Sequence, residues 1–373
     1  MDFELSQELT DLQESVRRLV EETILPQIME YEEKSILPLE IFRTIGREGF
    51  LKAHIPTEYG GLGLGTMAFC LVSEELGKAG AGLIHNGHFQ TQKMLVEYGT
   101  QKQREKYLPK LLNGEYLAAT AITEPTVGSS FATMQTTVKR HDHAFVLTGV
   151  KTLINDAAEA DVTNVFASSE EGISVFLVDK NTPGFRIVRK MDPIGMRSSP
   201  IYEFELKDCA LKAGQLVGPM GAGFTTFFSA FNFSRLGNAS AALGMAQSAF
   251  EKTLHYLRDR KVGTRVAAEF QGLRWLLAEL STLLEAARLL RNRAAVMEEV
   301  KQDISLESSQ TKLLCVEVAS RIVGDCIQAT GRYGCLRDNL FDVYLRDVKV
   351  LGTAGGSLEV MKNNIARHLI GGK

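Results

Sequence analysis

The stretch Thr123-Glu124-Pro125-Thr126-Val127-Gly128-Ser129-Ser130 stands where the texture of the chain changes. It combines hydroxyl side chains with a proline and a glycine, and such a segment lets backbone N–H groups approach an anion or a polar ring. The same composition also describes an ordinary capped loop. The stretch is informative because of its position in the chain. The hydrophobic pattern before it differs from the pattern after it, so it marks a boundary between two domains.

The pattern before this stretch is helical. Apolar residues recur at three- and four-residue steps over 9–20, and helical periodicity resumes over 67–76 and 87–98. Between them, Ile55-Pro56-Thr57-Glu58-Tyr59-Gly60-Gly61-Leu62-Gly63 joins a proline to clustered glycines, which predicts a loop. We therefore expect an N-terminal α-helical domain over residues 1–117.

The pattern after the stretch consists of short apolar or alternating runs, at 145–148, 162–167, 173–178 and 202–206. Turn residues separate these runs, as expected for β-strands. Because no helical pattern lies between them, a parallel α/β sheet is disfavoured. The sequence predicts a central antiparallel β domain over residues 118–222.

Long helical patterns return after residue 223. Apolar positions along 271–301 form a stripe wide enough to bury one face in a bundle, and further helices are predicted over 239–257, 308–330 and 357–369. We expect a C-terminal four-helix bundle over residues 223–373. A bundle that meets a β domain leaves a cleft at the junction, where cofactors commonly bind.

Composition narrows the classes of function. A net charge of −3 gives no electrostatic reason to expect nucleic acid or an anionic membrane as partner. The acidic N-terminus lacks the pattern of a signal peptide and no apolar run is long enough to span a bilayer, so we expect a cytoplasmic protein. The chain has no GxGxxG, P-loop or GxSxG motif, and its cysteines and histidines have no metal-ligand spacing, so no metal site is predicted.

Four motifs together resemble the acyl-CoA dehydrogenase family in order and spacing. They are Ile55–Gly63, Thr123-Glu124-Pro125 with Gly128-Ser129, Met196-Arg197-Ser198-Ser199-Pro200, and Leu345-Arg346-Asp347. The resemblance spans essentially the whole chain. It implies FAD between the β domain and the bundle, an acyl thioester on CoA or an acyl carrier protein, and a homodimer or homotetramer. It also implies an electron acceptor, either electron-transfer flavoprotein or O2.

The resemblance assigns flavin contacts in the β domain. Ile122, Thr123 and Ser129 would border the isoalloxazine or the thioester. The segment 151–155 matches the family's K-x-W-I-T/S, so Leu153 replaces the tryptophan that packs on the flavin and Asn155 replaces the hydroxyl residue near flavin N5. An amide still offers both a donor and an acceptor there, although the redox tuning would differ.

The resemblance also assigns residues in the C-terminal region. Arg260 corresponds to the arginine that contacts the FAD pyrophosphate across the subunit interface, and Gly263 stands where phenylalanine is usual. Arg332 replaces one glycine of the family's Q-x-x-G-G-x-G. The remaining implied cofactor contacts are Gln271, Gln328, Gly331, Ser357 and Glu359, and the implied substrate contacts are Asn232, Arg235 and Gly355.

The catalytic base is where the chain departs most from the resemblance. Removing an α-proton from an acyl thioester needs a carboxylate within hydrogen-bond reach. The commoner family glutamate falls on Gly355, and the alternative position, before the arginine of the first C-terminal helix, holds Ser234. A substitute could come from His88, or from His85 three residues earlier on the same helical face.

Three readings stay open. A relocated base would leave a conventional acyl-CoA dehydrogenase. A reaction on an aldehyde hydrate or amine would need no α-proton base, as in acyl-carrier-protein dehydrogenases that make polyketide extender units. The third is a non-catalytic flavin-binding relative. We expect the second hypothesis in its general form, which is FAD-dependent oxidation of a short or functionalised acyl group. The acyl group would be held as a phosphopantetheine thioester on an acyl carrier protein in specialised metabolism.

Overall fold

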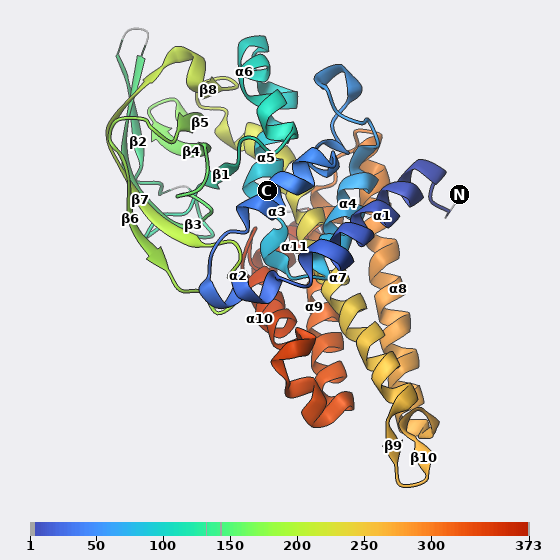
Figure 1. Ribbon diagram of the computed structural model, residues 1–373. Helices are drawn as coiled ribbons and strands as arrows, with labels where there is room; N and C mark the ends of the chain where they lie inside the picture. The colour runs from blue at the N-terminus through green and yellow to red at the C-terminus, as the bar shows by residue number, and fades with distance from the viewer. Residues whose placement is uncertain (1–3, 132, 142–143, 372–373) are drawn as a thin grey trace.

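The computed structural model describes residues 4–131, 133–141 and 144–371, and in Figure 1 a β-sheet lies at one end of a body of helices. The N-terminal region is helical, as predicted. Ser6 begins the first helix because its hydroxyl accepts a hydrogen bond from the Leu9 N–H at 3.4 Å. The helices before the sheet are α1 (Gln7–Leu19), α2 (Ile28–Lys34), α3 (Leu39–Arg47), α4 (Gly65–Gly77), α5 (Asn86–Tyr98) and α6 (Gln101–Leu112).

The middle region is a sheet with the strand order β6-β7-β3-β2-β4-β5-β8, and β1 pairs with β4. Neighbouring strands are antiparallel except that β1 runs parallel to β4 and β2 meets β4 in parallel at Thr137 and Ser168. The strands are β1 (Ala118–Ala121), β2 (Thr137–His141), β3 (Ala144–Asn155), β4 (Val162–Ser169), β5 (Gly172–Asp179), β6 (Phe185–Met191), β7 (Ile201–Lys212) and β8 (Leu216–Val217).

The C-terminal region is the predicted helical bundle, in which α7 packs on α8 and α9, and α10 and α11 pack on α9. Figure 1 shows the short hairpin of β9 and β10 at the end of the bundle away from the sheet. No helix in the described ranges combines the length and the apolar character that crossing a bilayer requires. The elements are α7 (Gly223–Asp259), β9 (Lys261–Val262), β10 (Arg265–Val266), α8 (Gln271–Glu299), α9 (Ser305–Thr330), α10 (Phe341–Leu351) and α11 (Leu358–Ile370).

The first helix after the sheet, α7, is longer than the predicted range 239–257. It begins at Gly223, where the sequence predicts that helical patterns return. Phe224, Phe227, Phe228 and Phe231 recur at three- and four-residue steps in its first turns. The helix packs on α4, α5 and β5 as well as on the bundle.

Asp347 joins the three regions of the chain. Its carboxylate accepts hydrogen bonds from the backbone N–H of Met196 at 2.6 Å and of Ala81 at 2.8 Å. Burial, reinforced by the nearby carboxylate of Glu32, raises the pKa of Asp347 to about 7. Two of the motifs that were noticed in the sequence, 196–200 and 345–347, therefore meet at this residue and hold the domains together.

Candidate active site

A buried ion pair supports the segment that was predicted to hold the cofactor. The Lys151 ammonium lies 2.8 Å from Glu124 Oε1 and donates to the Ile122 carbonyl at 3.0 Å. Glu124 also accepts from the backbone N–H of Gln135 and Thr136, and together with Lys151 these bonds hold the pKa of its carboxyl below the usual value. The ion pair of Lys151 and Glu124 therefore fixes the backbone of residues 122–124.

Strand β3 carries Leu153 and Asn155, which follow Lys151 along the chain. Leu153 has a φ of 57° and its side chain is 56% exposed, although it is a large apolar residue on the long strand β3. Asn155 donates from its amide to the Ser199 carbonyl at 3.1 Å and to the Ser199 hydroxyl at 3.0 Å. The strand therefore presents an apolar side chain to the outside while the asparagine is held within the protein.

These features fit a bound flavin. Leu153 offers apolar surface that a planar ring would cover, and Gly128 leaves open space beside its backbone. Phe224 and Phe228 on α7 add further exposed apolar surface, 36% and 47% exposed. Ile122 is half-buried next to the fixed segment, and Ser129 is exposed.

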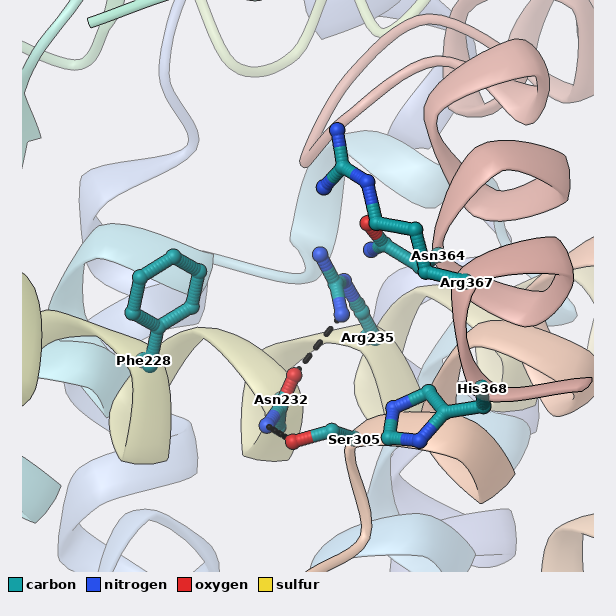
Figure 2. A pocket seen from close by; sticks show the side chains of 7 residues that line it. All are labelled: Phe228, Asn232, Arg235, Ser305, Asn364, Arg367 and His368. Carbon is teal, nitrogen blue, oxygen red and sulfur yellow. Dashed lines mark hydrogen bonds between the residues drawn. The ribbon is translucent and has the colours of Figure 1, made fainter. Parts of the chain in front are cut away.

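A pocket of about 270 Å³ opens between α7, the start of α9 and α11. Figure 2 shows two of the predicted substrate-binding residues, Asn232 and Arg235, on its floor, joined by a hydrogen bond of 2.7 Å. The side-chain amide of Asn232 in turn donates a hydrogen bond to the Ser305 hydroxyl at 3.2 Å. The pocket is lined by Phe228, Asn232, Arg235, Ser305, Asn364, Arg367 and His368.

Both expected positions of the base hold small residues in this structure. Ser234 is buried, its hydroxyl donates to the Phe231 carbonyl at 2.9 Å and it accepts from the Gln90 amide at 2.9 Å. Gly355 has a φ of 68°, and a Cβ at this position would lie 2.7 Å from Asn238 Nδ2. A side chain at residue 355 would therefore need the loop or Asn238 to move.

Lys312 lies under the Gly355 loop and is not among the residues predicted from the sequence. Its ammonium donates to the carbonyls of Ala354 and Gly356. A Cβ at Gly355 would lie 3.6 Å from Lys312 Nζ. Burial, together with the charge of Arg235, lowers the pKa of Lys312 to about 7. A lysine within a helical pattern reads as solvent-facing, so no signal in the sequence marked it.

The two histidines that were considered as substitute bases lie away from the pocket lining. His88 is fully buried, its Nε2 lies 3.1 Å from the Leu111 carbonyl and its Nδ1 accepts from the Ala118 N–H at 3.3 Å. Burial lowers the pKa of His88 to about 3. His85 pairs through Nδ1 with the buried Asp156 at 2.9 Å. Because both ring nitrogens of His88 have backbone partners, this geometry favours a structural role for it.

The residues expected to contact the pyrophosphate lie at the other end of the bundle. Arg260 is exposed just after α7, beside the β9–β10 hairpin, and Gln271 begins α8. Tyr256 and Tyr333 stack with ring centroids 4.5 Å apart, which brings the end of α7 to the end of α9, where Gln328 and Gly331 lie. Figure 1 shows this end far from the sheet. The structure thus does not bring these residues to the β-domain site of the same chain.

The start of α11 carries the last two predicted cofactor contacts. The Ser357 hydroxyl accepts from the Val360 N–H at 3.4 Å and so caps the helix. Glu359 is exposed in its first turn. Ser357 is therefore held beside the Gly355 loop, whereas the carboxylate of Glu359 points away from the buried part of the site.

Comparison with known proteins assigns nearly the whole chain to one family. The sequence matches the acyl-CoA dehydrogenase N-terminal domain over residues 6–115, the middle domain over 119–209 and the C-terminal domain over 221–370. It is 32% identical to an acryloyl-CoA reductase (NADH) of Anaerotignum propionicum, over 99% of this chain and 96% of that protein.

Two solved structures share the fold along the full chain. The structure of butyryl-CoA dehydrogenase from Megasphaera elsdenii has a TM-score of 0.96 and 27% identity, covering 99% of this chain and 100% of that one. The prolyl acyl carrier protein oxidase AnaB has a TM-score of 0.93 and 26% identity, covering 98% and 100%. With all three domains matched in order, the chain belongs to the acyl-CoA dehydrogenase family and is an FAD-dependent oxidoreductase of that family.

Proposed function

We propose that this enzyme oxidises a short acyl group that carries a hydroxyl or an amine, presented as a phosphopantetheine thioester on an acyl carrier protein. The observation that carries the proposal is a pair of amides beside Gly355. Asn86 Nδ2 donates to Asn238 Oδ1 at 2.6 Å, and Asn86 Oδ1 is buried without a hydrogen-bond partner in the described structure.

In this proposal the free amide oxygen of Asn86 sets the chemistry of the acyl group. A buried acceptor without a partner costs about 1–3 kcal/mol, and an unsubstituted alkyl chain would leave it unsatisfied. A hydroxyl or amine on the acyl group supplies the missing donor. Gln90 and Ser234 add a second buried polar pair on α5 and α7. These polar groups favour a functionalised acyl group over a saturated hydrocarbon chain.

The reaction follows from the same arrangement. Oxidation at a carbon that bears a hydroxyl or an amine removes a hydride from that carbon and releases the proton of the heteroatom to water, so no proton has to be taken from an α-carbon. When bound, FAD supplies the two-electron acceptor. In this proposal Asn86 orients the heteroatom proton through its amide oxygen. The reaction is then compatible with glycine and serine at the two positions that carry a base elsewhere in the family.

A further observation supports a carrier-bound acyl group. One of the solved relatives is by its name an oxidase of a prolyl group on an acyl carrier protein.

A homo-oligomer is part of the same proposal. Arg260, Gln271 and Gln328 would reach FAD only from a second copy of the chain, because they lie at the end of the bundle away from the sheet. On α8, Trp275, Leu289 and Val296 are 62%, 51% and 51% exposed. Such a stripe of large apolar side chains suits burial between subunits.

Anaerobic reduction of the flavin tests the proposal. The flavin band near ~450 nm is followed after addition of hydroxyacyl or aminoacyl groups on a carrier protein, and of the same groups on CoA. Bleaching by the carrier-bound groups supports the proposal, and equal rates with CoA would refute the carrier requirement. Reoxidation by O2 or by electron-transfer flavoprotein then identifies the acceptor. If no thioester bleaches the flavin, the chain is a non-catalytic relative.

A further inference from the structure

Two buried cations beside the Gly355 loop lack a carboxylate partner. Arg235 is 2% exposed and Lys312 is 0% exposed. Arg235 donates to Asn232 Oδ1 at 2.7 Å and to the Ser309 hydroxyl at 3.3 Å, and Lys312 donates to two backbone carbonyls. Within the described residues, neither one forms an ion pair with an aspartate or a glutamate.

Other cations of this chain that are buried to the same degree have carboxylate partners. Lys151, 0% exposed, pairs with Glu124 at 2.8 Å. Arg291, 1% exposed, pairs with Glu74 at 2.8 Å. A buried charge without a counter-ion is costly, so buried cations are normally paired. Arg235 and Lys312 therefore differ from the rule that the rest of the molecule follows.

Arg235 also keeps a free donor. Its Nε is buried and has no hydrogen-bond partner in the described structure, although the side chain forms part of the pocket floor. Ser309 and Lys312 lie one turn apart on α9, and Arg235 contacts Ser309. Arg235 therefore lies at the pocket, and the buried ammonium of Lys312 follows one turn beyond its contact on α9.

The carboxylates near this region are already used. Glu307 pairs with Arg293 at 3.2 Å, and Asp303 caps the start of α9 through Ser305. The groups at the pocket edge on α11, Arg367 and His368, are basic. A carboxylate on a ligand would therefore supply the negative charge that balances Arg235 and Lys312.

We infer that Arg235 and Lys312 bind a carboxylate carried by the acyl group, so that the bound acyl group is a monothioester of a short dicarboxylic acid. This inference rests on the proposed function, because it takes the acyl end of the thioester to lie at Gly355. Arg235 supplies a directional donor through Nε, and Lys312 supplies a positive charge behind it. A phosphate of the phosphopantetheine arm would lie at the opposite end of the ligand from this position.

The binding has a characteristic pH dependence. A carboxylate beside Lys312 stabilises its protonated form, so binding takes up a proton once the free enzyme has lost it. Because the pKa of Lys312 is about 7 without ligand, affinity for a carboxylate falls as the pH rises above that value. Burial lowers the pKa of Arg235 only to about 10, so Arg235 stays largely charged over this range. Arg367 and His368 also face the ligand from the pocket edge.

The test compares two probes on the FAD-loaded enzyme. They are malonyl-pantetheine and its uncharged monoamide, which have similar shapes and contain no phosphate. Binding is measured by the change in the flavin spectrum and by the rise in melting temperature. A charge-assisted pair predicts that malonyl-pantetheine binds at least about tenfold more tightly at pH 6.5. The preference should shrink toward pH 9, and His368→Asn should keep that trend.

Two variants and one control locate the site. Lys312→Met and Arg235→Gln should each bring the two probes to within about threefold of one another. Lys252→Met is the control, because Lys252 also has a pKa lowered by burial, to about 8, but donates to Asn339 and Tyr344 away from the pocket. It should keep the full preference. If either pocket variant does not fold, the other one and the pH trend still decide.

Three results would overturn the inference. These are equal affinity for the two probes in the parent enzyme, a preference that survives in both Lys312→Met and Arg235→Gln, and binding of 4′-phosphopantetheine alone as tightly as malonyl-pantetheine with loss in Lys312→Met. The last result would assign the anion site to phosphate. Failure of the proposed function gives a different outcome, because the probes would then bind with the expected preference while no thioester bleached the flavin.

Discussion

Asn86 and Asn238, from α5 and α7, join their side-chain amides at 2.6 Å directly beside Gly355. Asn238 Nδ2 lies 2.7 Å from the place where a Cβ at residue 355 would stand. The absence of a glutamate is thus matched by an amide that fills the adjoining space. In the proposed function, polar recognition of the acyl group takes the place of a carboxylate base here.

Restoring the glutamate should therefore need two substitutions. Gly355→Glu alone places a side chain against Asn238 at a left-handed φ, which should lower the melting temperature and the FAD content. Asn238→Ala opens the space, so the double variant should be more stable than the sum of the single effects by about 1 kcal/mol. Thermal unfolding of the four proteins measures this coupling. Simple additivity would show that residues 355 and 238 do not compete for space.

The same pair of variants also tests the chemistry. Gly355→Glu with Asn238→Ala should gain flavin reduction by butyryl-CoA, because a carboxylate then stands near the α-carbon of a simple acyl chain. Asn238→Ala alone should not. A folded, FAD-loaded double variant without this activity would mean that the pocket does not hold an acyl chain in the expected orientation.

His88→Gln should change stability and leave the rate of flavin reduction unchanged. The ring of His88 is buried and bonds to backbone atoms of Leu111 and Ala118, so losing it should cost about 1–3 kcal/mol. Stopped-flow reduction and thermal unfolding separate the two effects. A large fall in the reduction rate without a loss of stability would return His88 to consideration as the base.

The depressed pKa of His88 adds a pH test. With a folded pKa of about 3 and an unfolded value near 6.5, the unfolded state binds more protons between these limits. The stability of the parent protein therefore falls as the pH drops from about 6.5 toward 3. His88→Gln should show a shallower fall than the parent. An equal slope in both proteins would contradict the buried neutral state.

The fold could be predicted from the sequence where the hydrophobic pattern was local and marked one face of a helix or strand. The four motifs proved to be structural junctions: Asp347 holds Met196, Glu124 holds the segment before β2, and Gly61 lies so close to the Ile55 carbonyl that a Cβ would not fit. Ordered junctions of this kind mark the family strongly. The helical region after the sheet was predicted to begin after residue 223, and α7 begins at Gly223, although its full length was not predicted.

The site was harder to read than the fold. The positions of Gly355 and Ser234 could be assigned by counting along motifs, and their lack of a carboxylate was visible at once. Lys312, Asn86 and Asn238 could not be found in this way, because each sits within a helical pattern where a polar residue reads as surface. Only the packing of α5, α7 and α9 shows that these side chains face inward and toward Gly355.

The contribution of a second subunit to FAD binding can be tested with Arg260→Ala. If the guanidinium contacts the pyrophosphate, its loss should weaken FAD binding by about 10–100-fold. Arg258→Ala is the matched control, because it removes the same charge from an exposed residue of the same helix end. FAD titration of the apoprotein measures both. Equal effects would indicate a general charge effect and refute the contact.

Mixed oligomers then show whether the contact crosses the interface. Lys151→Met should loosen the segment 122–124 on the β domain and weaken FAD binding there, because Ile122 and Glu124 lose their shared donor. A mixed oligomer of Lys151→Met and Arg260→Ala chains should contain some sites with both residues intact. Recovery of tight FAD binding on mixing is expected. No recovery would place both residues at one site within a single chain.

The most direct test of the central claim is the anaerobic rate of flavin reduction by matched thioesters, with and without deuterium at the α-carbon. The proposed function predicts reduction by a hydroxyacyl or aminoacyl thioester at least about tenfold faster than by the butyryl thioester. For substrates with the hydroxyl or amine on the β-carbon, it also predicts an isotope effect near unity for α-deuteration. Equally fast reduction by the butyryl thioester, with a clear α-deuterium effect, would contradict the claim and return the enzyme to conventional α,β-dehydrogenation.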